Sequence, residues 1–291
     1  MRKFNKDSFT IAGAEFNTRM GLITLAVSCG VLAILVVLRM VGVEYSWYGV
    51  LMGVAFLLAL AFSIKYCKYR DLDRDLPYDL IWWIFPLSLL GARLYFCIFE
   101  GSFDIFFDFS KGGLAVYGGI IGGAIGLILC CIIKKVNILK AMDVVAPVLI
   151  MGQAIGRIGC YTAGCCYGME ITDKAMQWFP IGYFVHGEWH LATFFWECVL
   201  CIIGFFVLAK LLQRFQSTGL IASSYLFYYG IVRYFTESFR DPNAQLVAGG
   251  VPVSQIVSLI LCIVGTIGIV VIVLKERNKL SVEKGNDSAT N

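Results

Sequence analysis

Residues 253–274 read VSQIVSLILCIVGTIGIVVIVL and contain no Asp, Glu, Lys or Arg. About 20 apolar residues are enough for a helix to cross the hydrocarbon core of a bilayer. The residues that follow include Lys275, Arg277 and Lys279, and basic residues are typical of the cytoplasmic side of a spanning helix. The stretch therefore predicts a transmembrane helix, and with it a membrane protein.

Seven further apolar stretches precede this one, at residues 21–40, 46–64, 78–99, 112–133, 143–160, 191–209 and 219–236. We therefore expect an all-α integral membrane protein of about eight transmembrane helices. The segments between the stretches alternate in charge, and the basic ones are the leader, 65–77, 134–142, 210–218 and the tail. Because basic loops stay in the cytoplasm, both termini should be cytoplasmic. The segments expected to face outward are 41–46, 100–111, 161–190 and 237–252.

The overall composition argues against a soluble protein. Of the 291 residues, 59% are hydrophobic and 15% are charged, whereas a soluble domain carries roughly a quarter charged residues. The net charge of +4 implies no nucleic-acid partner, because Lys and Arg lie in short clusters between the apolar stretches. No cleavable signal is expected, since the run at 21–40 is longer than a signal-peptide core and no small-residue cleavage site follows it.

Several ionisable residues lie within or at the end of the predicted spans: Arg93, Arg157, Arg233, Glu237 and Arg240. Ionisable groups inside a membrane are costly, so they mark functional sites by default. Each arginine alone could instead extend its charge to the headgroups. The predicted topology places most of them at the outer end, although basic residues are normally enriched on the cytoplasmic side. This gathering of positive charge outside favours an anionic ligand there. Arg233 and Glu237 are four residues apart and can pair on one helix face.

Glycines are dense at the start of the span at 112–133. Small residues three or four apart, such as Gly122 and Gly126, permit close contact between helices. For Gly112–Gly119, exposed backbone N–H groups approaching a ligand are an equally good interpretation. The candidates in that stretch are Gly112, Gly113, Gly118 and Gly119.

Cys160, Cys165 and Cys166 differ from the other cysteines because they follow a span in a polar, glycine-rich segment. The pattern C-x4-C-C does not match a zinc spacing, so no metal site is expected. Packing of small residues is the favoured interpretation, with an outward disulfide or a reactive thiol as alternatives.

Five sequence blocks, in collinear order over about residues 45–275, resemble the prolipoprotein diacylglyceryl transferase family. They are Trp47-Tyr48-Gly49, Gly91-Ala92-Arg93-Leu94-Tyr95, Gly112–Gly119, Gly156-Arg157-Ile158-Gly159, and the run from Arg233 to Gln245. The last block is the most specific. A single Gly-Gly or Gly-Arg pair would mean little, but five blocks in the same order as in the family are hard to obtain by chance.

The resemblance implies a fold and a reaction. The fold would be a seven-helix core at 45–277, preceded by a polar leader and an extra helix at 1–44 and followed by a cytoplasmic tail at 278–291. The reaction would move a diacylglyceryl group from phosphatidylglycerol to the lipobox cysteine of prolipoproteins, at the outer leaflet of a bacterial cell membrane, without metal or organic cofactor. Arg157 and Arg233 would handle the phosphate. Glu237 is the first candidate for the base. Tyr48, Arg93, Arg240 and the glycines named above would bind substrate.

The sequence departs from the family at three places. Tyr117 stands where many members have a histidine. Residues 160–165 lack two asparagines and a carboxylate of the family pattern, and residues 191–197 echo another family block only loosely. His186 and His190 are expected at the surface. Two alternatives therefore remain: a paralogue acting on another acceptor, or a phospholipid-binding membrane protein without catalysis. A thiol-redox protein is the weakest, because no C-x-x-C is present.

Overall fold

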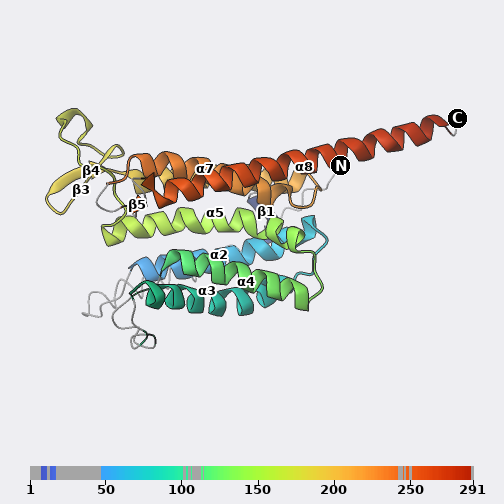
Figure 1. The fold of residues 1–291 in the computed structure, drawn as a ribbon, viewed down its shortest axis with the longest axis horizontal. Helices are drawn as coiled ribbons and strands as arrows, with labels where there is room; N and C mark the ends of the chain where they lie inside the picture. The colour runs from blue at the N-terminus through green and yellow to red at the C-terminus, as the bar shows by residue number, and fades with distance from the viewer. Residues whose placement is uncertain are drawn as a thin grey trace.

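The computed structural model describes residues 8–11, 14–17, 47–100, 103, 106, 113, 115–241, 245, 247–248 and 251–289. Within these residues the chain is mostly helical. The seven helices are α2 (Trp47–Tyr66), α3 (Leu76–Glu100), α4 (Val116–Ile133), α5 (Ile138–Ala163), α6 (Thr193–Arg214), α7 (Leu220–Ser238) and α8 (Val253–Ala289). They lie side by side along one direction, and the far end of α8 extends beyond the others (Figure 1).

Each of the seven predicted stretches after residue 45 corresponds to one of these helices. Six of the helices are long and apolar enough to cross a membrane by length and composition, and α7 is the exception. The prediction of an all-α, multi-pass membrane protein is therefore confirmed. The predicted first span at 21–40 lies outside the described residues, so the count of about eight stays a prediction, as does the cytoplasmic position of the termini.

The short strands lie outside the helices. β1 (Ser8–Ile11) pairs with β2 (Ala14–Asn17), β3 (Gly182–Val185) with β4 (Glu188–Leu191), and β5 (Val247–Ala248) with β6 (Val251–Pro252), all antiparallel. Two 3-10 turns complete the order, η1 (Cys67–Tyr69) and η3 (Lys174–Met176). The β3–β4 hairpin projects beyond one end of the helices (Figure 1). We call this end, where α5 and α7 finish and α6 begins, the site end, and the other the opposite end.

The bounds of α5 follow from its caps. Asn137 precedes the helix, and its side chain accepts hydrogen bonds from the N–H groups of Leu139 and Lys140. At the other end Gly164 adopts a left-handed conformation with φ of 61°. Its N–H donates to Tyr161, and the N–H of Cys165 donates to Cys160, which together make a Schellman cap. Because Lys140 in its first turn was counted with the basic loop 134–142, the sequence predicted a shorter span, 143–160.

Glycines on α4 allow α3 and α4 to pack in direct backbone contact. A Cβ atom at Gly118 would lie 2.2 Å from the carbonyl oxygen of Gly91, and one at Gly122 would lie 2.1 Å from that of Leu87. A Cβ atom at Gly126 would lie 2.6 Å from the carbonyl oxygen of Trp83. The Ser88 hydroxyl donates to the carbonyl of Gly119 at 2.8 Å. In this structure Gly118 and Gly119 therefore serve helix packing, which was one of the two interpretations of the sequence.

The main core lies between α2, α5, α6 and α7 and includes Phe62, Ile150, Cys201, Leu208 and Ile221. In contrast, many large apolar side chains point away from the bundle. Leu57 is 66% exposed, Ile120 63% and Ile263 58%. A soluble protein rarely leaves such continuous apolar surface uncovered, whereas lipid tails cover it in a membrane protein. Polar groups consequently gather at the two ends of the bundle and on the inner face of α7.

Candidate functional site

The candidate site is built around Glu197, in the first turns of α6. Its carboxylate accepts a hydrogen bond from Arg157 of α5, with 2.7 Å between Nη2 and Oε1. It also pairs with Arg233 of α7, with 3.3 Å between Nη1 and Oε2. Tyr229 and Thr236 donate to the same carboxylate at 3.4 Å each. One carboxylate thus joins the two arginines, which come from different helices.

A second carboxylate extends the cluster along α7. Arg233 Nη2 lies 2.5 Å from Glu237 Oε2, which confirms the i,i+4 pair expected from the sequence. Arg240 Nη1 lies 3.6 Å from the same oxygen. We call Arg157, Glu197, Arg233, Glu237 and Arg240 the arginine cluster. Glu237 is 2% exposed and contacts two guanidinium groups, so its first role in this structure is to hold them.

The arginine cluster carries a net positive charge. Three guanidinium groups against two carboxylates leave one positive charge. The two carboxylates are 3% and 2% exposed, whereas the side chains of Arg157, Arg233 and Arg240 are 17%, 16% and 22% exposed. The Nε atom of Arg240 is buried and has no hydrogen-bond partner among the described residues. A buried donor without an acceptor is costly. The cluster is therefore suited to accept an anionic group with hydrogen-bond acceptors.

An aromatic cavity of about 240 Å³ adjoins the arginine cluster. Arg157 supplies its basic side chain, and the rest of the lining comes from Ile158, Tyr161, Phe179, Phe194, Phe195 and Cys198. Tyr48 of α2 packs on α5 close by, because a Cβ atom at Gly159 would lie 2.7 Å from its ring. A charged head beside an apolar wall matches an amphipathic ligand such as a phospholipid.

Arg93 has a different environment from the other predicted site arginines. It is 1% exposed and donates through Nε to the carbonyl of Phe106 and through Nη1 to that of Gly113, each at 2.9 Å. Gly113 has a φ of 85°, and a Cβ atom there would lie 2.4 Å from the Phe96 ring. Arg93 thus fixes the chain before α4. Tyr117, in the first turn of α4, lies near the Tyr95 ring at 6.4 Å between centroids. Gly112 lies outside the described residues.

Three cysteines meet beside the arginine cluster. The sulfur atoms of Cys160, Cys165 and Cys166 all lie within 4.8 Å of one another, and all three residues are free thiols. Arg240 Nη2 approaches the Cys166 sulfur at 3.9 Å. A hydrogen bond from Cys160 lowers the pKa of Cys166, and the charges of Arg157 and Arg240 act in the same direction against burial. We call these residues the thiol cluster.

One expectation about the histidines was wrong. His186 is exposed at the tip of the β3–β4 hairpin, as predicted, but His190 is buried. Its Nδ1 lies 3.2 Å from the carbonyl of Gly168, and its ring packs on Tyr167 with 4.4 Å between centroids. The register of the hairpin turns His190 inward against the segment 167–170. This register could not be predicted from the sequence, in which the segment looks like an irregular loop.

Glu197 is the functional residue that the sequence analysis left out of the site. It belongs to residues 191–197, which resemble a family block only loosely, whereas the arginines were selected because they are charged residues within a predicted span. The same criterion selects Glu197, since a carboxylate five residues into an apolar helix needs a partner.

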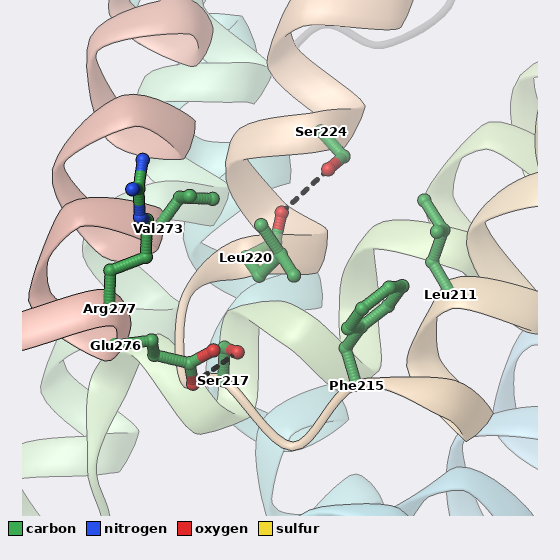
Figure 2. Close-up of a pocket in the computed structure, with 8 residues that line it drawn as sticks. All are labelled: Leu211, Phe215, Ser217, Leu220, Ser224, Val273, Glu276 and Arg277. Carbon is green, nitrogen blue, oxygen red and sulfur yellow. Dashed lines mark hydrogen bonds between the residues drawn. The ribbon is translucent and has the colours of Figure 1, made fainter. Parts of the chain in front are cut away.

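A larger cavity, of about 370 Å³, lies at the opposite end between α6, α7 and α8. Figure 2 shows it lined by Leu211, Phe215, Leu220 and Val273, with Ser217 meeting Glu276. Arg277 is the basic residue in its lining, and it is exposed. By size alone this cavity would be the better candidate for a ligand site. The arginines that converge on one carboxylate are at the site end, so the candidate functional site is there.

Comparisons with known proteins show the family of the chain. The model of the family "Prolipoprotein diacylglyceryl transferase" matches residues 35–271. The chain belongs to the prolipoprotein diacylglyceryl transferase family. A relative from Clostridium perfringens, named phosphatidylglycerol–prolipoprotein diacylglyceryl transferase 1, is 31% identical over 81% of this chain and 93% of its own length. Relatives with the same name but no numeral are 34% identical in Streptococcus uberis (80% and 92% covered) and 32% in Listeria innocua (81% and 88%).

The family match extends over all seven described helices, although it ends within α8. It includes every residue of the arginine cluster and the thiol cluster. The family resemblance drawn from five sequence blocks is therefore confirmed over the matched residues, 35–271.

Proposed function

We propose that this protein transfers a diacylglyceryl group from phosphatidylglycerol to the cysteine thiol of prolipoproteins. Its membership of the transferase family and the names of its relatives support the reaction. The observation that carries the proposal in this structure is the arginine cluster, a partly buried net positive charge beside an aromatic cavity. The protein would act at the outer leaflet of a bacterial cell membrane, on the lipobox cysteine of its substrates, without nucleic acid or organic cofactor.

The arginines would act on the phosphate. When the acceptor thiolate attacks the glycerol carbon, the bond from that carbon to the phosphate oxygen breaks and glycerol phosphate leaves. Charge builds on the leaving phosphate, and preorganised guanidinium groups stabilise it. Arg157 lines the cavity, and Arg240 has a buried Nε–H without an acceptor among the described residues. Glu197 and Glu237 would keep these arginines in place before substrate arrives, so that little reorganisation accompanies the reaction.

Tyr48 packs against α5 at Gly159, next to Ile158 of the cavity lining, and would bind substrate there. Arg93 is buried and would act indirectly, by holding the chain before α4. Gly112 and Gly113 belong to that same segment. Glu237 remains our first candidate for the proton acceptor, although it is occupied by two arginines. Tyr117 would take part in catalysis from the position at which many family members have a histidine.

We also propose that the site end faces outward. The support is the alternation of basic and neutral loops along the sequence, with the basic loops expected inside. A cysteine reporter placed in 237–252 should react with a membrane-impermeant thiol reagent added from outside, and one placed in 65–77 should not. The reverse pattern would refute both the orientation and the location of the site.

The division of the chain is a further part of the proposal. Residues 45–277 would form the transferase core, with 1–44 as a leader and additional helix and 278–291 as a cytoplasmic tail. A correctly inserted truncation that starts near residue 45 should still bind phosphatidylglycerol. Failure to bind would show that the additional helix belongs to the site.

The decisive experiment is transfer of labelled diacylglyceryl from phosphatidylglycerol to a lipobox peptide by purified protein. Rescue of cells depleted of their own transferase is the companion test. Binding of phosphatidylglycerol without transfer to this peptide would favour a phospholipid-binding protein or a paralogue with another acceptor. The replaced segment at 160–166 is the feature that gives those alternatives weight.

A further inference from the structure

The thiol cluster results from the way α5 ends. In a Schellman cap the side chains at the fourth residue from the end of the helix and at the second residue beyond it come together. Cys160 and Cys165 occupy these two positions. Cys166 follows with a φ of 60°, a left-handed conformation that is unfavourable for a residue with a Cβ atom. Backbone strain of this kind is retained where the surrounding structure requires it, often at ligand sites.

The separation of the sulfur atoms suits a metal ion. Zinc–sulfur bonds of about 2.3 Å in a tetrahedral site place ligand sulfurs about 3.8 Å apart. The three sulfurs already lie within 4.8 Å of one another, so modest side-chain rotations close the site. The sequence predicted no zinc site, because C-x4-C-C is not a zinc spacing. The helix cap folds the segment back on itself and brings the three sulfurs together despite that spacing.

The charges around the cluster favour an anionic metal–thiolate complex. Three thiolates and one divalent cation carry a net charge of −1. Arg240 Nη2 lies 3.9 Å from the Cys166 sulfur, and Arg157 is three residues before Cys160 on the same helix. Cations and N–H donors next to ligand sulfurs compensate their charge and orient them. The surroundings therefore supply the positive charge that such a complex needs.

We propose that Cys160, Cys165 and Cys166 bind one thiophilic d10 cation, of which Zn²⁺ is the divalent example, and leave its fourth coordination position for a thiol from outside the chain. Soft thiolate ligands select ions of this class. Three protein ligands with an open position are typical of zinc sites that take part in reactions, whereas structural sites are closed by four.

The role of the fourth position rests on the proposed function, in which the acceptor is a thiol. Coordination of that thiol releases its proton to water, because a metal-bound thiol is deprotonated. The bound sulfur then forms a bond to the glycerol carbon, and the electron pair of the broken carbon–oxygen bond leaves with glycerol phosphate. No oxidation or reduction occurs. The metal would thereby generate the thiolate in a chain that has Tyr117 in place of the family's histidine.

The first test measures metal binding without reference to activity. Reduced, chelator-treated wild-type protein in detergent is titrated with Zn²⁺ or Cd²⁺, and one ion per chain is expected. Cys165→Ser should weaken binding by at least about tenfold, the scale seen even for outer-shell partners. Cys166→Ser repeats the test in case Cys165→Ser folds poorly. Cys262→Ser, in α8 and away from the cluster, is the matched control and should bind as wild type does. Equal affinity in all variants would overturn the proposal.

The same samples test a disulfide as the alternative. Thiol counting by alkylation before reduction should find Cys165 and Cys166, the two partly exposed cysteines of the cluster, reactive in the metal-free protein and protected in the metal-loaded one. A loss of two thiols in the metal-free protein that a reductant restores would show a disulfide in the cluster and would overturn the metal site.

The second test addresses the fourth position. Protein loaded with Co²⁺ is mixed with a lipobox peptide carrying cysteine, or with the same peptide carrying serine. The cysteine peptide alone should increase the thiolate-to-cobalt absorbance, and removal of metal should reduce transfer. An unchanged spectrum would overturn the acceptor role. A spectral increase with no transfer by loaded or metal-free protein would leave the metal site standing and refute the proposed transferase function.

Discussion

Two buried ionic clusters lie at opposite ends of α5, about 21 Å apart along the helix. At the opposite end, Arg70 donates through Nε to Asp143 at 2.9 Å, and the two side chains are 1% and 0% exposed. Asp143 also accepts the N–H groups of Gly219 and Ala222 at the start of α7. Arg70 donates further to the carbonyls of Phe215 and Ser217. This pair joins three parts of the chain and is closed to ligands.

The arginine cluster at the site end has the opposite properties. Its arginines are partly exposed, they exceed the carboxylates by one, and a buried Nε–H of Arg240 has no acceptor among the described residues. Both clusters hold charge inside a membrane bundle, so buried charge alone does not identify a site. A buried cluster identifies a candidate site when its charges and hydrogen-bond donors are not fully paired and it lies next to a cavity.

Removal of the Asp143 charge should give the largest effect, and it should be on stability. Asp143→Asn leaves Arg70 buried without a counter-charge, which costs roughly 3 to 5 kcal/mol. Thermal unfolding in detergent should show the loss, while transfer activity per folded molecule stays near that of wild type. Lost activity with unchanged stability would mean that the opposite end also takes part in the reaction.

Substitution of Arg157 or Arg233 by Lys should act on activity. A point charge cannot replace a bidentate fork on phosphate. The loss of transition-state stabilisation should be on the order of 2 to 4 kcal/mol, a fall of roughly a hundredfold or more in transfer rate. Unfolding temperatures should change little in comparison with Asp143→Asn. Transfer at wild-type rates in both Lys variants would refute the phosphate clamp.

Glu197→Gln should have a smaller effect on the same rate. The amide cannot hold two guanidinium groups as a carboxylate does, and hydrogen bonds to charged groups contribute about 1.5 to 3 kcal/mol. Transfer should fall by about tenfold to a hundredfold, since Arg157 and Arg233 lose their common partner. A mainly higher KM would mean that Glu197 positions the arginines for binding. An unchanged rate would show that the two arginines do not need it.

Glu237→Gln distinguishes two roles. If Glu237 accepts the proton, transfer should fall while phosphatidylglycerol binding and folding yield are kept. If it mainly holds Arg233 and Arg240, folding yield and binding should fall together. Measurement of binding, yield and rate on one preparation decides between them.

Arg277→Lys should have the smallest effect, within about 0.5 kcal/mol in stability, as is usual for surface substitutions. Arg277 is exposed at the opposite end, where a lysine extends its charge equally well. It is the control for the two Lys variants at the site end. A large loss here would show that the cavity in Figure 2 has a function of its own.

Much of the fold could be predicted because the bilayer fixes the length and composition of spanning helices. The seven described helices were found from hydropathy, with α5 predicted too short. The site could be predicted in part, since charges within spans identified Arg157, Arg233 and Glu237. Pairing across helices could not be read from one sequence. Arg70 therefore looked like a loop residue, and the partnership of Glu197 with two arginines was missed.

The cap at Gly164 has an evolutionary consequence. The backbone of this turn brings the positions of Cys160 and Cys165 together whatever side chains they carry. Two single-codon changes on an existing helix end are then sufficient to create a pair of adjacent thiols, with no change of fold. Replacement of either cysteine would remove this pair of thiols and leave the turn in place.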